Sequence, residues 1–516
     1  MNSLVQKVIS KMNISLEEYY NLIKDVDFSS LENPSCFKNI DIATNRIKQA
    51  IKNNEKIMIY GDYDCDGISA TSILYLTFKK LNYNVGYYIP SRYKDGYGIN
   101  ENMVDIISSK GYNLIITVDN GVSQIDALKK AKELNIDVIL TDHHEILNDL
   151  PLCYTIVHPS LKENKEYLPE CGAYVAFMLS IKLLGYVDEY LLTLASLATI
   201  SDMMPLRLDN RNIVKLGIKS LQNNKYDTLM KLCDNPSFIN EKTFSFSIAP
   251  KVNSLGRIIK DTKVNRMVSY LTSCSEEEQN TLLKYINSVV LERKTITDEA
   301  FKKIDLSSFQ NDNVIVKVFD DVCEGVIGLV AQKVLMECKK PCVCLCYGEE
   351  GILKGSCRSL IGFNIAEALN DLDDLLIAHG GHAQAGGLSL NKENLPLFKE
   401  KINSLAKGVV LKEKEKLIVD VTKDDLSEDN FLEFSKLAPF GEGFEEPYFK
   451  VKISKDNIIK ISNGKHIRGS ISSSCSFIGW NLGEREFLED VYLIGKLEIN
   501  EFRGKQTLNL KVEEIQ

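Results

Sequence analysis

Short apolar runs alternate with helical patterns between residues 56 and 157, and this alternation limits the folds open to the chain. The runs have the length of strands, and between them apolar residues recur at three- and four-residue spacing, as on one face of a helix. Such alternation is typical of a parallel sheet with helices on both faces. The predicted strands are 56–60, 84–89, 114–118, 138–140 and 154–157, and the predicted helices are 70–81, 102–109 and 123–134.

Acidic and imidazole side chains follow three of these runs at the point where each strand ends. In chain order they are Asp62, Asp64, Asp66, Asp119, Asp142, His143 and His144. A later apolar helix, 190–200, ends near one more carboxylate, Asp202. The carboxyl ends of parallel strands meet at one edge of a sheet, and function gathers there. The sequence therefore predicts that these side chains form one cluster.

A cluster of this kind requires protons or cations. Two like charges about 4 Å apart repel by about 4 kcal/mol near a protein surface. Asp and His together, without Cys, favour manganese or magnesium over structural zinc, although the ligand types alone leave zinc and iron open. The sequence predicts a site for Mn²⁺ or Mg²⁺.

The acidic motifs have two simpler interpretations. The spacing of Asp62, Asp64 and Asp66 matches the start of an EF-hand calcium loop, but Ile73 stands where that loop needs Glu, and a strand precedes it rather than a helix. The EF-hand interpretation therefore fails. Asp119 taken alone is most typical of a helix N-cap or a turn residue. The metal-site interpretation prevails when it is taken together with the other strand ends and the His143-His144 pair.

Composition narrows the class of protein. A chain of 516 residues with 44% hydrophobic residues is expected to form several globular domains. The 13 cysteines include no C-x-x-C pair, which favours reduced thiols, and no uncharged apolar run reaches the roughly 18 residues of a membrane span. We expect a soluble protein of the cytoplasm. The net charge of −9 disfavours nucleic acid as a partner unless bound metal supplies positive charge.

Four segments carry a resemblance to the DHH phosphoesterase superfamily, in the order and approximate spacing of its motifs: GDYDCDG, VDNG, TDHHE and ATISDMMPL. Others resemble the RecJ family of bacterial single-strand-specific 5′ to 3′ exonucleases, and the likeness covers nearly all of the chain after about residue 50. These are RYKDGYGIN, IAPKVNSLGRI, EGVIGLVA, GSCRS, GGHAQAGG, LAPFGEGFEEPYF and LEINEFRGKQTLNLKVEEI. Val322 and Cys323 stand where the family commonly has a Trp-His pair.

The resemblance implies a two-ion site for Mn²⁺ or Mg²⁺. The implied ligands are Asp64, Asp66, Asp119, His143 and Asp202. Asp119 would bridge the ions, and Asp62 would bind an ion directly or hold a metal-bound water. His144 is expected to meet substrate phosphate or to orient the ligands. Asp142 is expected to fix the imidazoles, because a ligating His needs its second nitrogen held.

The resemblance also implies a binding site for the 5′ phosphate and the adjacent backbone of the DNA strand. The implied residues are Arg92, Arg257, Ser356 and Arg358, whose guanidinium groups suit phosphate. His382 in GGHAQAGG would join them on a glycine-rich backbone that a ligand can approach closely. The alternative for that segment is the end of a helix over 364–379.

Four domains are expected. They are an N-terminal helical segment with the DHH catalytic domain (1–207), a helical region with a long connecting helix over 275–304 (208–306), a DHH-associated substrate-binding domain (307–408), and a C-terminal domain (409–516). Short strands with turns after about residue 412 indicate a small barrel, which the resemblance makes OB-like. No basic stripe is readable there, and Trp480 is as typical of a core as of a stacking platform.

The resemblance implies a metal-dependent 5′ to 3′ exonuclease that hydrolyses single-stranded DNA to 5′-mononucleotides in recombination and repair. The alternatives are a DHH enzyme acting on oligoribonucleotides or cyclic dinucleotides, and a non-catalytic replication scaffold. The scaffold would be expected to lack ligands, which this chain retains. The expected partners are single-stranded DNA, single-strand-binding protein and a RecQ-type helicase, with the chain acting as a monomer in the bacterial cytoplasm.

Overall fold

The chain divides into two units whose boundaries do not follow the order of the sequence. Unit 1 comprises residues 1–31, 203–216 and 415–516, and unit 2 comprises residues 32–202 and 217–414. The computed structural model describes residues 1–146, 149–162, 167–348, 351–502 and 505–516. Among these residues, no helix has the length and apolar character needed to cross a membrane.

The first part of unit 2 is a parallel sheet, as predicted, and its strand order is β2-β1-β3-β4-β5. Its strands are β1 (Ile57–Tyr60), β2 (Gly86–Tyr88), β3 (Leu114–Val118), β4 (Asp137–Thr141) and β5 (Thr155–Val157). Tyr60 pairs with Thr117, and Val118 pairs with Thr141, so β1, β3 and β4 end at one edge. Every residue of β1 and β3 is buried, because helices cover both faces of the sheet.

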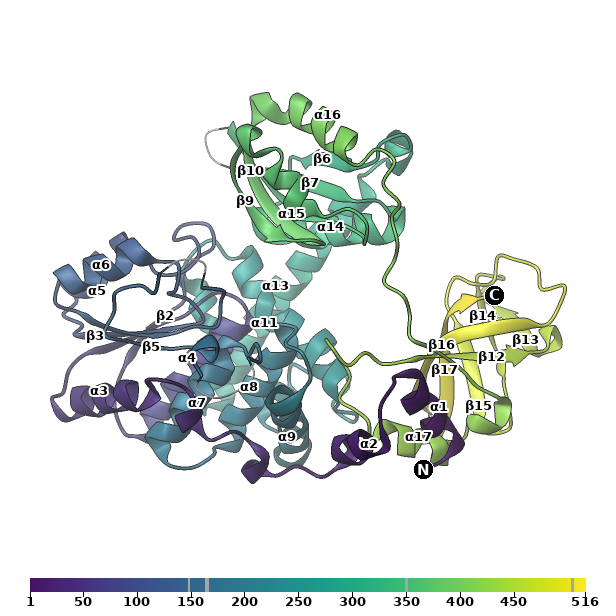
Figure 1. The fold of residues 1–516 in the computed structure, drawn as a ribbon, viewed down its shortest axis with the longest axis horizontal. Coiled ribbons are helices and arrows are strands. Elements are labelled where there is room, and N and C mark those ends of the chain that lie inside the picture. The colour runs from purple at the N-terminus through teal and green to yellow at the C-terminus, as the bar shows by residue number, and fades with distance from the viewer. Residues whose placement is uncertain (147–148, 163–166, 349–350, 503–504) are drawn as a thin grey trace. The chain divides into compact units, whose positions relative to one another are not determined.

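The helices of this part lie on both faces of the sheet, and Figure 1 shows α5 and α6 on one face and α3 and α7 on the other. Met103 of α5 and Leu128 of α6 share a core with Met58 and Ile115 of the strands. The helices are α3 (Ile40–Lys52), α4 (Cys65–Lys80), α5 (Glu101–Ser109), α6 (Ile125–Glu133), α7 (Gly172–Leu184) and α8 (Glu189–Ser201).

A helical region follows, and it ends in the predicted long helix. That helix, α13, spans Glu276–Lys302; Ser275 caps it by accepting the N–H of Glu278, and three glutamates occupy its first turn, as the helix dipole favours. The other elements are α9 (Leu208–Asn224), which has residues in both units, α10 (Asp227–Met230), a π-helix (Thr243–Ile248), α11 (Ala249–Ile258) and α12 (Arg266–Thr272).

A second, mixed sheet completes unit 2 in the order β6-β7-β8-β10-β9. Only β6 and β7 are parallel. The elements are β6 (Ile315–Phe319), α14 (Glu324–Cys338), β7 (Cys342–Tyr347), β8 (Ile352–Arg358), α15 (Ile365–Asn370), β9 (Leu376–His382), β10 (Ala385–Asn391) and α16 (Leu395–Leu405).

The helix considered over 364–379 is wrong beyond Asn370. Residues Leu376–His382 form β9, and the GGHAQAGG segment makes the tight connection into β10, with His382 paired with Ala385. Gly381 has a φ of +142°, which a residue with a side chain rarely adopts. The pairing between β9 and β10 outweighs the helical spacing of the apolar residues.

Unit 1 contains a mixed seven-stranded sheet in the order β11-β12-β16-β17-β15-β14-β13. Its strands are β11 (Ile418–Asp420), β12 (Tyr448–Ile453), β13 (Ile458–Ile461), β14 (His466–Ser470), β15 (Cys475–Gly479), β16 (Val491–Phe502) and β17 (Lys505–Ile515). All seven lie in the stretches where short strands are expected from the sequence. Besides the first part of α9, the unit contains the helices α1 (Ser3–Lys11), α2 (Leu16–Ile23) and α17 (Glu428–Ser435).

The N-terminal helices share a hydrophobic core with this sheet. Leu4 and Val5 of α1 are buried in one cluster with Phe434 and Phe449, and the Ser3 hydroxyl donates to Oδ1 of Asp425 at 2.6 Å. Residues 1–31 therefore group with the C-terminal strands, whereas the sequence analysis groups them with residues 32–207. The apolar face of an amphipathic helix indicates that the helix packs against another surface, but it does not indicate which surface that is.

Candidate metal centre and phosphate cavity

The loop after β1 presents three carboxylates because α4 begins inside it. Asp64 is the N-cap of α4, and its Oδ1 accepts the backbone N–H groups of Asp66 and Gly67 at 3.0 Å each. A Cβ at Gly67 would lie 2.6 Å from the backbone N of Asp62, so the turn needs glycine. Asp66 accepts the N–H of Gly172 at 2.6 Å and that of Ala173 at 2.7 Å, at the positive end of α7.

Asp119 follows β3 in a left-handed conformation, with a φ of +62°. Its backbone N–H donates to the carbonyl of Thr141 at 3.0 Å, so β4 holds the turn. Gly172 lies against it, and an added Cβ would be 2.6 Å from the Asp119 Cβ. The Asp119 carboxylate therefore lies beside that of Asp66, which the same glycine binds.

The two histidines have different neighbours. Nε2 of His143 lies 3.1 Å from Oδ1 of Asp119, and 3.5 Å from Oδ2 of both Asp66 and Asp202. Nδ1 of His144 instead lies 2.8 Å from Oδ1 of Asp142, which also accepts the His143 N–H at 2.7 Å. Asp142 thus fixes the ring of His144, and it touches His143 through the backbone.

The seven acidic and histidine residues predicted from the strand ends come together in this centre with Asp202, which follows helix α8. Ligand atoms within 4.8 Å of one another form three groups: Asp62, Asp64 and Asp119; Asp66, His143 and Asp202; Asp119, His143 and His144. Within this centre, three buried carboxylate oxygens make no hydrogen bond to the described residues: Asp62 Oδ1, Asp119 Oδ1 and Asp202 Oδ2. Buried carboxylate oxygens without donors fit hard divalent cations, and Asp119 belongs to two of the groups.

The pKa values of the carboxyl groups in the centre show that their negative charges are not compensated. Burial, reinforced by neighbouring carboxylates, raises the pKa of Asp62 and Asp119 well above the usual range and that of Asp202 to about 8. Burial lowers the pKa of His143, which favours the neutral ring that binds metal.

Asp142 and His144 stay ionised as a pair. Burial opposes both charges, yet the hydrogen bond between them and their mutual attraction hold the pKa of Asp142 at about 2 and raise that of His144 to about 9. At neutral pH His144 therefore carries a proton beside the carboxylates that lack partners.

We expect the metal-free protein to lose stability as the pH rises from about 4 to about 8. The pKa of Asp202 is about 8 when folded, whereas an unfolded Asp titrates near about 4. Between these values the folded state holds a proton that the unfolded state has released, so the free energy of unfolding falls by at most about 1.4 kcal/mol per pH unit from this group. The raised pKa of His144 acts in the same direction.

Thermal unfolding in the presence of a chelator, recorded across this pH range, measures the slope. The Asp202→Asn variant should show a shallower slope, and Asp126→Asn, at an exposed site on α6, should match the wild type. Stability that rises with pH over this interval would contradict the prediction.

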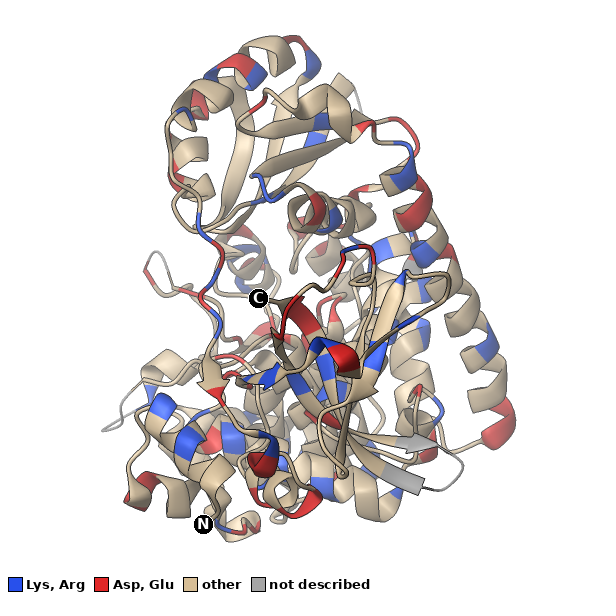
Figure 2. Ribbon diagram, turned by 90° about the vertical axis from the view of Figure 1, so that its right-hand side faces the viewer, with Lys and Arg blue, Asp and Glu red and all other residues tan. Residues whose placement is uncertain are grey.

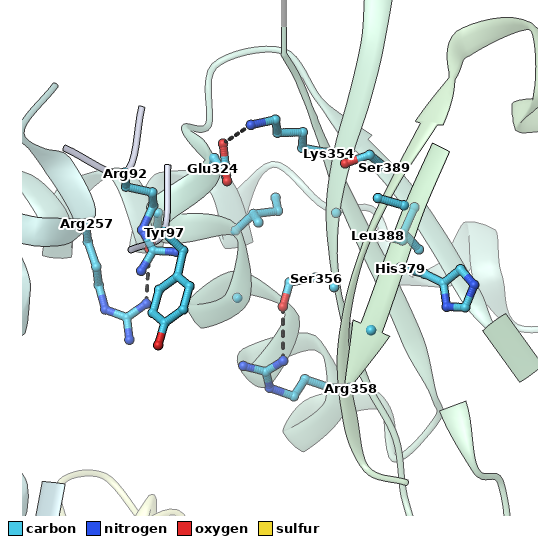
Figure 3. A pocket seen from close by; sticks show the side chains of 17 residues that line it. Arg92, Tyr97, Arg257, Glu324, Lys354, Ser356, Arg358, His379, Leu388 and Ser389 are labelled. Atoms are coloured by element: carbon cyan, nitrogen blue, oxygen red, sulfur yellow. Dashed lines mark hydrogen bonds and ion pairs between the residues drawn. The ribbon is translucent and has the colours of Figure 1, made fainter. Parts of the chain in front are cut away.

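A cavity of about 780 Å³ opens in the same unit, and its lining is rich in cations. Figure 3 shows Arg92, Arg257 and Tyr97 on one side of it and Ser356 and Arg358 on the other. Arg92 stacks over the ring of Tyr63 at 4.1 Å, and its buried Nε has no hydrogen-bond partner among the described residues. Cations gathered in this way are suited to phosphate.

Arg257 and Arg358 are held in place by backbone and hydroxyl groups. Arg257 donates from Nη1 to the carbonyl of Gly325 at 3.1 Å, and Arg358 donates from Nη1 to the Ser356 hydroxyl at 3.0 Å. Burial and the positive charge of Arg92 lower the pKa of Arg257 to about 10, so the guanidinium remains charged at neutral pH. An anion in the cavity would relieve this repulsion.

Four of the five predicted phosphate residues line the cavity, and His382 does not. His382 is exposed at the turn end of β9, whereas His379 on the same strand lines the cavity and binds Asp373. Tyr97, Lys354 and Glu324 also line the cavity, and the sequence did not single them out. The alternate positions of Lys354, Ser356 and Arg358, which the structure places on strand β8, were a readable signal for the lysine.

Tyr97 connects the cavity with the metal centre. It lines the cavity, its hydroxyl lies 3.0 Å from Nδ1 of His144, and it donates to the Asp119 carbonyl at 3.2 Å. The two parts of the site therefore share a wall.

Three family models match the chain in order. They are the DHH family N-terminal domain over residues 56–199, the DHHA1 domain over 311–408 and the RecJ OB domain over 419–514. The α/β fold with a C-terminal OB domain expected from the sequence is confirmed.

Curated relatives and solved structures agree with these models. The single-stranded-DNA-specific exonuclease RecJ of Bacillus subtilis is 34% identical over 537 residues, covering 99% of this chain and 67% of that protein. The RecJ of Salmonella typhimurium is 28% identical, covering 92% of this chain and 90% of that protein.

A crystal structure of Thermus thermophilus RecJ with Mn²⁺ has the same fold, with a TM-score of 0.84 at 24% identity, covering 99% of this chain and 77% of that chain. Another, of exonuclease RecJ bound to manganese, is 27% identical with a TM-score of 0.62, covering 72% of this chain and 95% of that chain. Because a curated relative is one third identical over 99% of this chain, and the DHH, DHHA1 and RecJ OB models all match, this chain belongs to the RecJ family of single-stranded-DNA-specific exonucleases.

Proposed function

We propose that this chain is a metal-dependent exonuclease that hydrolyses single-stranded DNA from its 5′ end and releases 5′-mononucleotides. The observation that carries the proposal is the wall shared through Tyr97 by a carboxylate and imidazole centre and a cation-lined cavity. A strand end held in the cavity would place a phosphodiester bond at the centre. Because the cavity would bind the 5′ end of the strand, hydrolysis would start from that end.

The centre would hold two Mn²⁺ or Mg²⁺ ions. Asp62, Asp64 and Asp119 form one proposed ligand group, and a second contains Asp66, His143 and Asp202. When bound, such ions activate water and neutralise charge on the phosphodiester and its leaving oxygen. Gly172 and Ala173 orient Asp66 through their N–H groups, so this ligand is positioned before an ion arrives.

His144 is proposed to contact the scissile phosphate. Its ring keeps a proton at neutral pH because Asp142 holds Nδ1, and its side chain is 43% exposed while that of Asp142 is almost fully buried. A charged imidazolium facing the solvent suits a phosphate oxygen. Asp142 would act through His144 as a positioning residue.

The proposed reaction is tested with Mn²⁺ and a 5′-phosphorylated, 3′-labelled single-stranded DNA oligonucleotide. Progressive shortening from the 5′ end, with blunt duplex left intact, is the expected result. Intact single strands under both Mn²⁺ and Mg²⁺ would contradict the proposal, and dinucleotides would then be the next substrates to test.

We expect Arg358→Met to weaken the use of 5′-phosphorylated ends. The loss of one charge-assisted contact with phosphate costs roughly 1.5 to 3 kcal/mol, or about 10- to 100-fold in kcat/KM. Strands with a 5′ hydroxyl should be affected less. Lys401→Met removes a charge from the same sheet domain outside the cavity and should leave both rates unchanged. An equal loss on both kinds of end would contradict the assignment of Arg358.

We also propose that the enzyme acts as a monomer in recombination and repair in the bacterial cytoplasm, where it meets single-strand-binding protein and a RecQ-type helicase. The family resemblance supports this proposal. Figure 2 shows charges of both signs along the ribbon, in keeping with the net charge of −9. Affinity for DNA would therefore rest on local groups such as those of the cavity rather than on net charge.

A further inference from the structure

The cavity contains one feature that phosphate binding does not explain. Its lining includes three arginines and Lys354, which phosphate attracts, but also the carboxylate of Glu324. A carboxylate repels phosphate strongly in a partly buried site. Glu324 is 30% exposed and its carboxylate lies on the cavity, so it is not simply turned away to the solvent.

The position of Glu324 is defined by two elements. Glu324 is the first residue of α14, and its Oε2 lies 2.8 Å from Nζ of Lys354. Lys354, Ser356 and Arg358 occupy alternate positions of β8, so they share one face of the sheet. Figure 3 shows the Glu324–Lys354 pair toward the other end of this row from Arg358.

The row therefore has two ends of different character. At one end, Arg358 and Ser356 are hydrogen-bonded to each other with no carboxylate among the cavity-lining residues beside them. At the other end, Lys354 is already paired with a carboxylate. About 7 Å separates successive side chains on one face of a strand, so Lys354 and its partner Glu324 come next to Ser356 along the row. With the terminal phosphate bound at Ser356 and Arg358, the Glu324 end is the part of the row left for a further phosphate.

We propose that Glu324 is a specificity-determining residue that limits the cavity to strand ends carrying a single terminal phosphate. Its carboxylate repels any further phosphate, as in a 5′-triphosphate end, and it occupies the lysine that would otherwise bind that phosphate. The proposal rests on the proposed function, because it concerns which 5′ ends that reaction accepts.

A purely structural role for Glu324 predicts something different. An acidic residue in the first turn of a helix stabilises the helix dipole, and a partly exposed ion pair adds at most about 1 kcal/mol. Removal of such a residue would lower thermal stability and slow every substrate equally. Only a role in specificity changes the ratio between two ends.

The test compares kcat/KM for two single-stranded oligonucleotides of the same sequence, one with a 5′-monophosphate and one with a 5′-triphosphate. The wild type should prefer the monophosphate by at least about tenfold, since like charges brought together cost several kcal/mol. Glu324→Gln, which keeps the shape of the side chain and frees Lys354, should reduce that preference at least about fivefold. Lys354→Met, which leaves the carboxylate unpaired, should widen it.

The matched control is Asp298→Asn, which breaks the ion pair of Asp298 with Lys333 outside the cavity. It should leave the ratio at the wild-type value. An unchanged ratio in both Glu324→Gln and Lys354→Met, or equal slowing on both strands, would overturn the proposal while the exonuclease activity stands. A wild type that degrades neither strand would overturn the proposed function, and this inference with it. If Glu324→Gln does not fold, the widened ratio of Lys354→Met still decides.

Discussion

The Asp119→Asn variant should lose activity by about 10³-fold or more, the upper range for a single preorganised electrostatic group. Asp119 belongs to one of the two proposed ligand groups, and its Oδ1 lies 3.1 Å from Nε2 of His143 in the other, so its charge acts on both proposed ion sites. Asparagine tolerates the left-handed backbone at this position, which has a φ of +62°, so the fold should persist. The rate of release of 5′-mononucleotides from single-stranded DNA measures the loss.

The same substitution should stabilise the metal-free protein. Burial and the charges of Asp66 and Asp64 raise the pKa of Asp119, which means that its ionised form is costly in the fold. Removal of this charge should gain about 1 kcal/mol, or roughly 2 to 4 °C in Tm, at a pH of about 8. Mn²⁺ should raise the Tm of the wild type and have little effect on the variant.

Asp126→Asn is the matched control for these measurements, since Asp126 is exposed on α6 and lies outside the three groups. It should keep the wild-type activity and the wild-type response to Mn²⁺. An Asp119→Asn protein that remained active, or that still gained stability from Mn²⁺, would contradict the assignment of Asp119.

The Gly172→Ala variant should lose about 100-fold in activity, the loss expected when reacting groups are misplaced by about 1 Å. A methyl group at Gly172 would lie 2.6 Å from the Cβ and 2.9 Å from the Cα of Asp119. The N–H of the same residue binds Asp66, so one methyl group disturbs two proposed ligands. Overpacking of this kind typically costs about 1 to 3 kcal/mol of stability, which denaturant unfolding measures.

A double variant separates the clash from a general effect on α7. Asp119→Gly removes the Cβ and the carboxylate that the new methyl group would meet. Gly172→Ala should therefore destabilise the Asp119→Gly protein less than the wild type, and activity should stay low. Equal destabilisation in both backgrounds would show that the clash with Asp119 is not the cause.

Local patterns in the sequence were sufficient for the elements that carry the metal centre. The five strands of the parallel sheet lie within a few residues of their predicted ranges, and α13 begins directly after Ser275, the first residue of its predicted range. Each of these signals lies within one segment: apolar spacing, a capping residue or a charge order. The carboxyl-edge rule then placed Asp62 to Asp66, Asp119 and the two histidines together without knowledge of any contact.

Contacts between distant segments were not readable in the same way. Gly172 lies against Asp119 because α7 packs beside β3, and a glycine at a helix start shows no such role in sequence. Tyr97 lies in the loop after β2, and its hydroxyl contacts His144, which is 47 residues later in the chain. This contact between two loops has no local signal in the sequence. His382 was expected in the cavity on its glycine-rich context, and the pairing of β9 with β10 leaves it exposed.

The sequence by itself determined the parallel α/β sheet, the cluster of carboxylates and imidazoles at one edge of it, and the family to which the motifs belong. The sheet and the cluster depend on the period of apolar residues and on which residue ends each strand, and both are local properties. The family follows from the resemblance of the motifs alone. Only the tertiary structure decided which cations face Ser356, that Glu324 stands among them, and that residues 1–31 pack with the C-terminal strands. Those features arise when segments far apart in the chain pack against one another. The local sequence around a residue does not determine which distant segment it contacts.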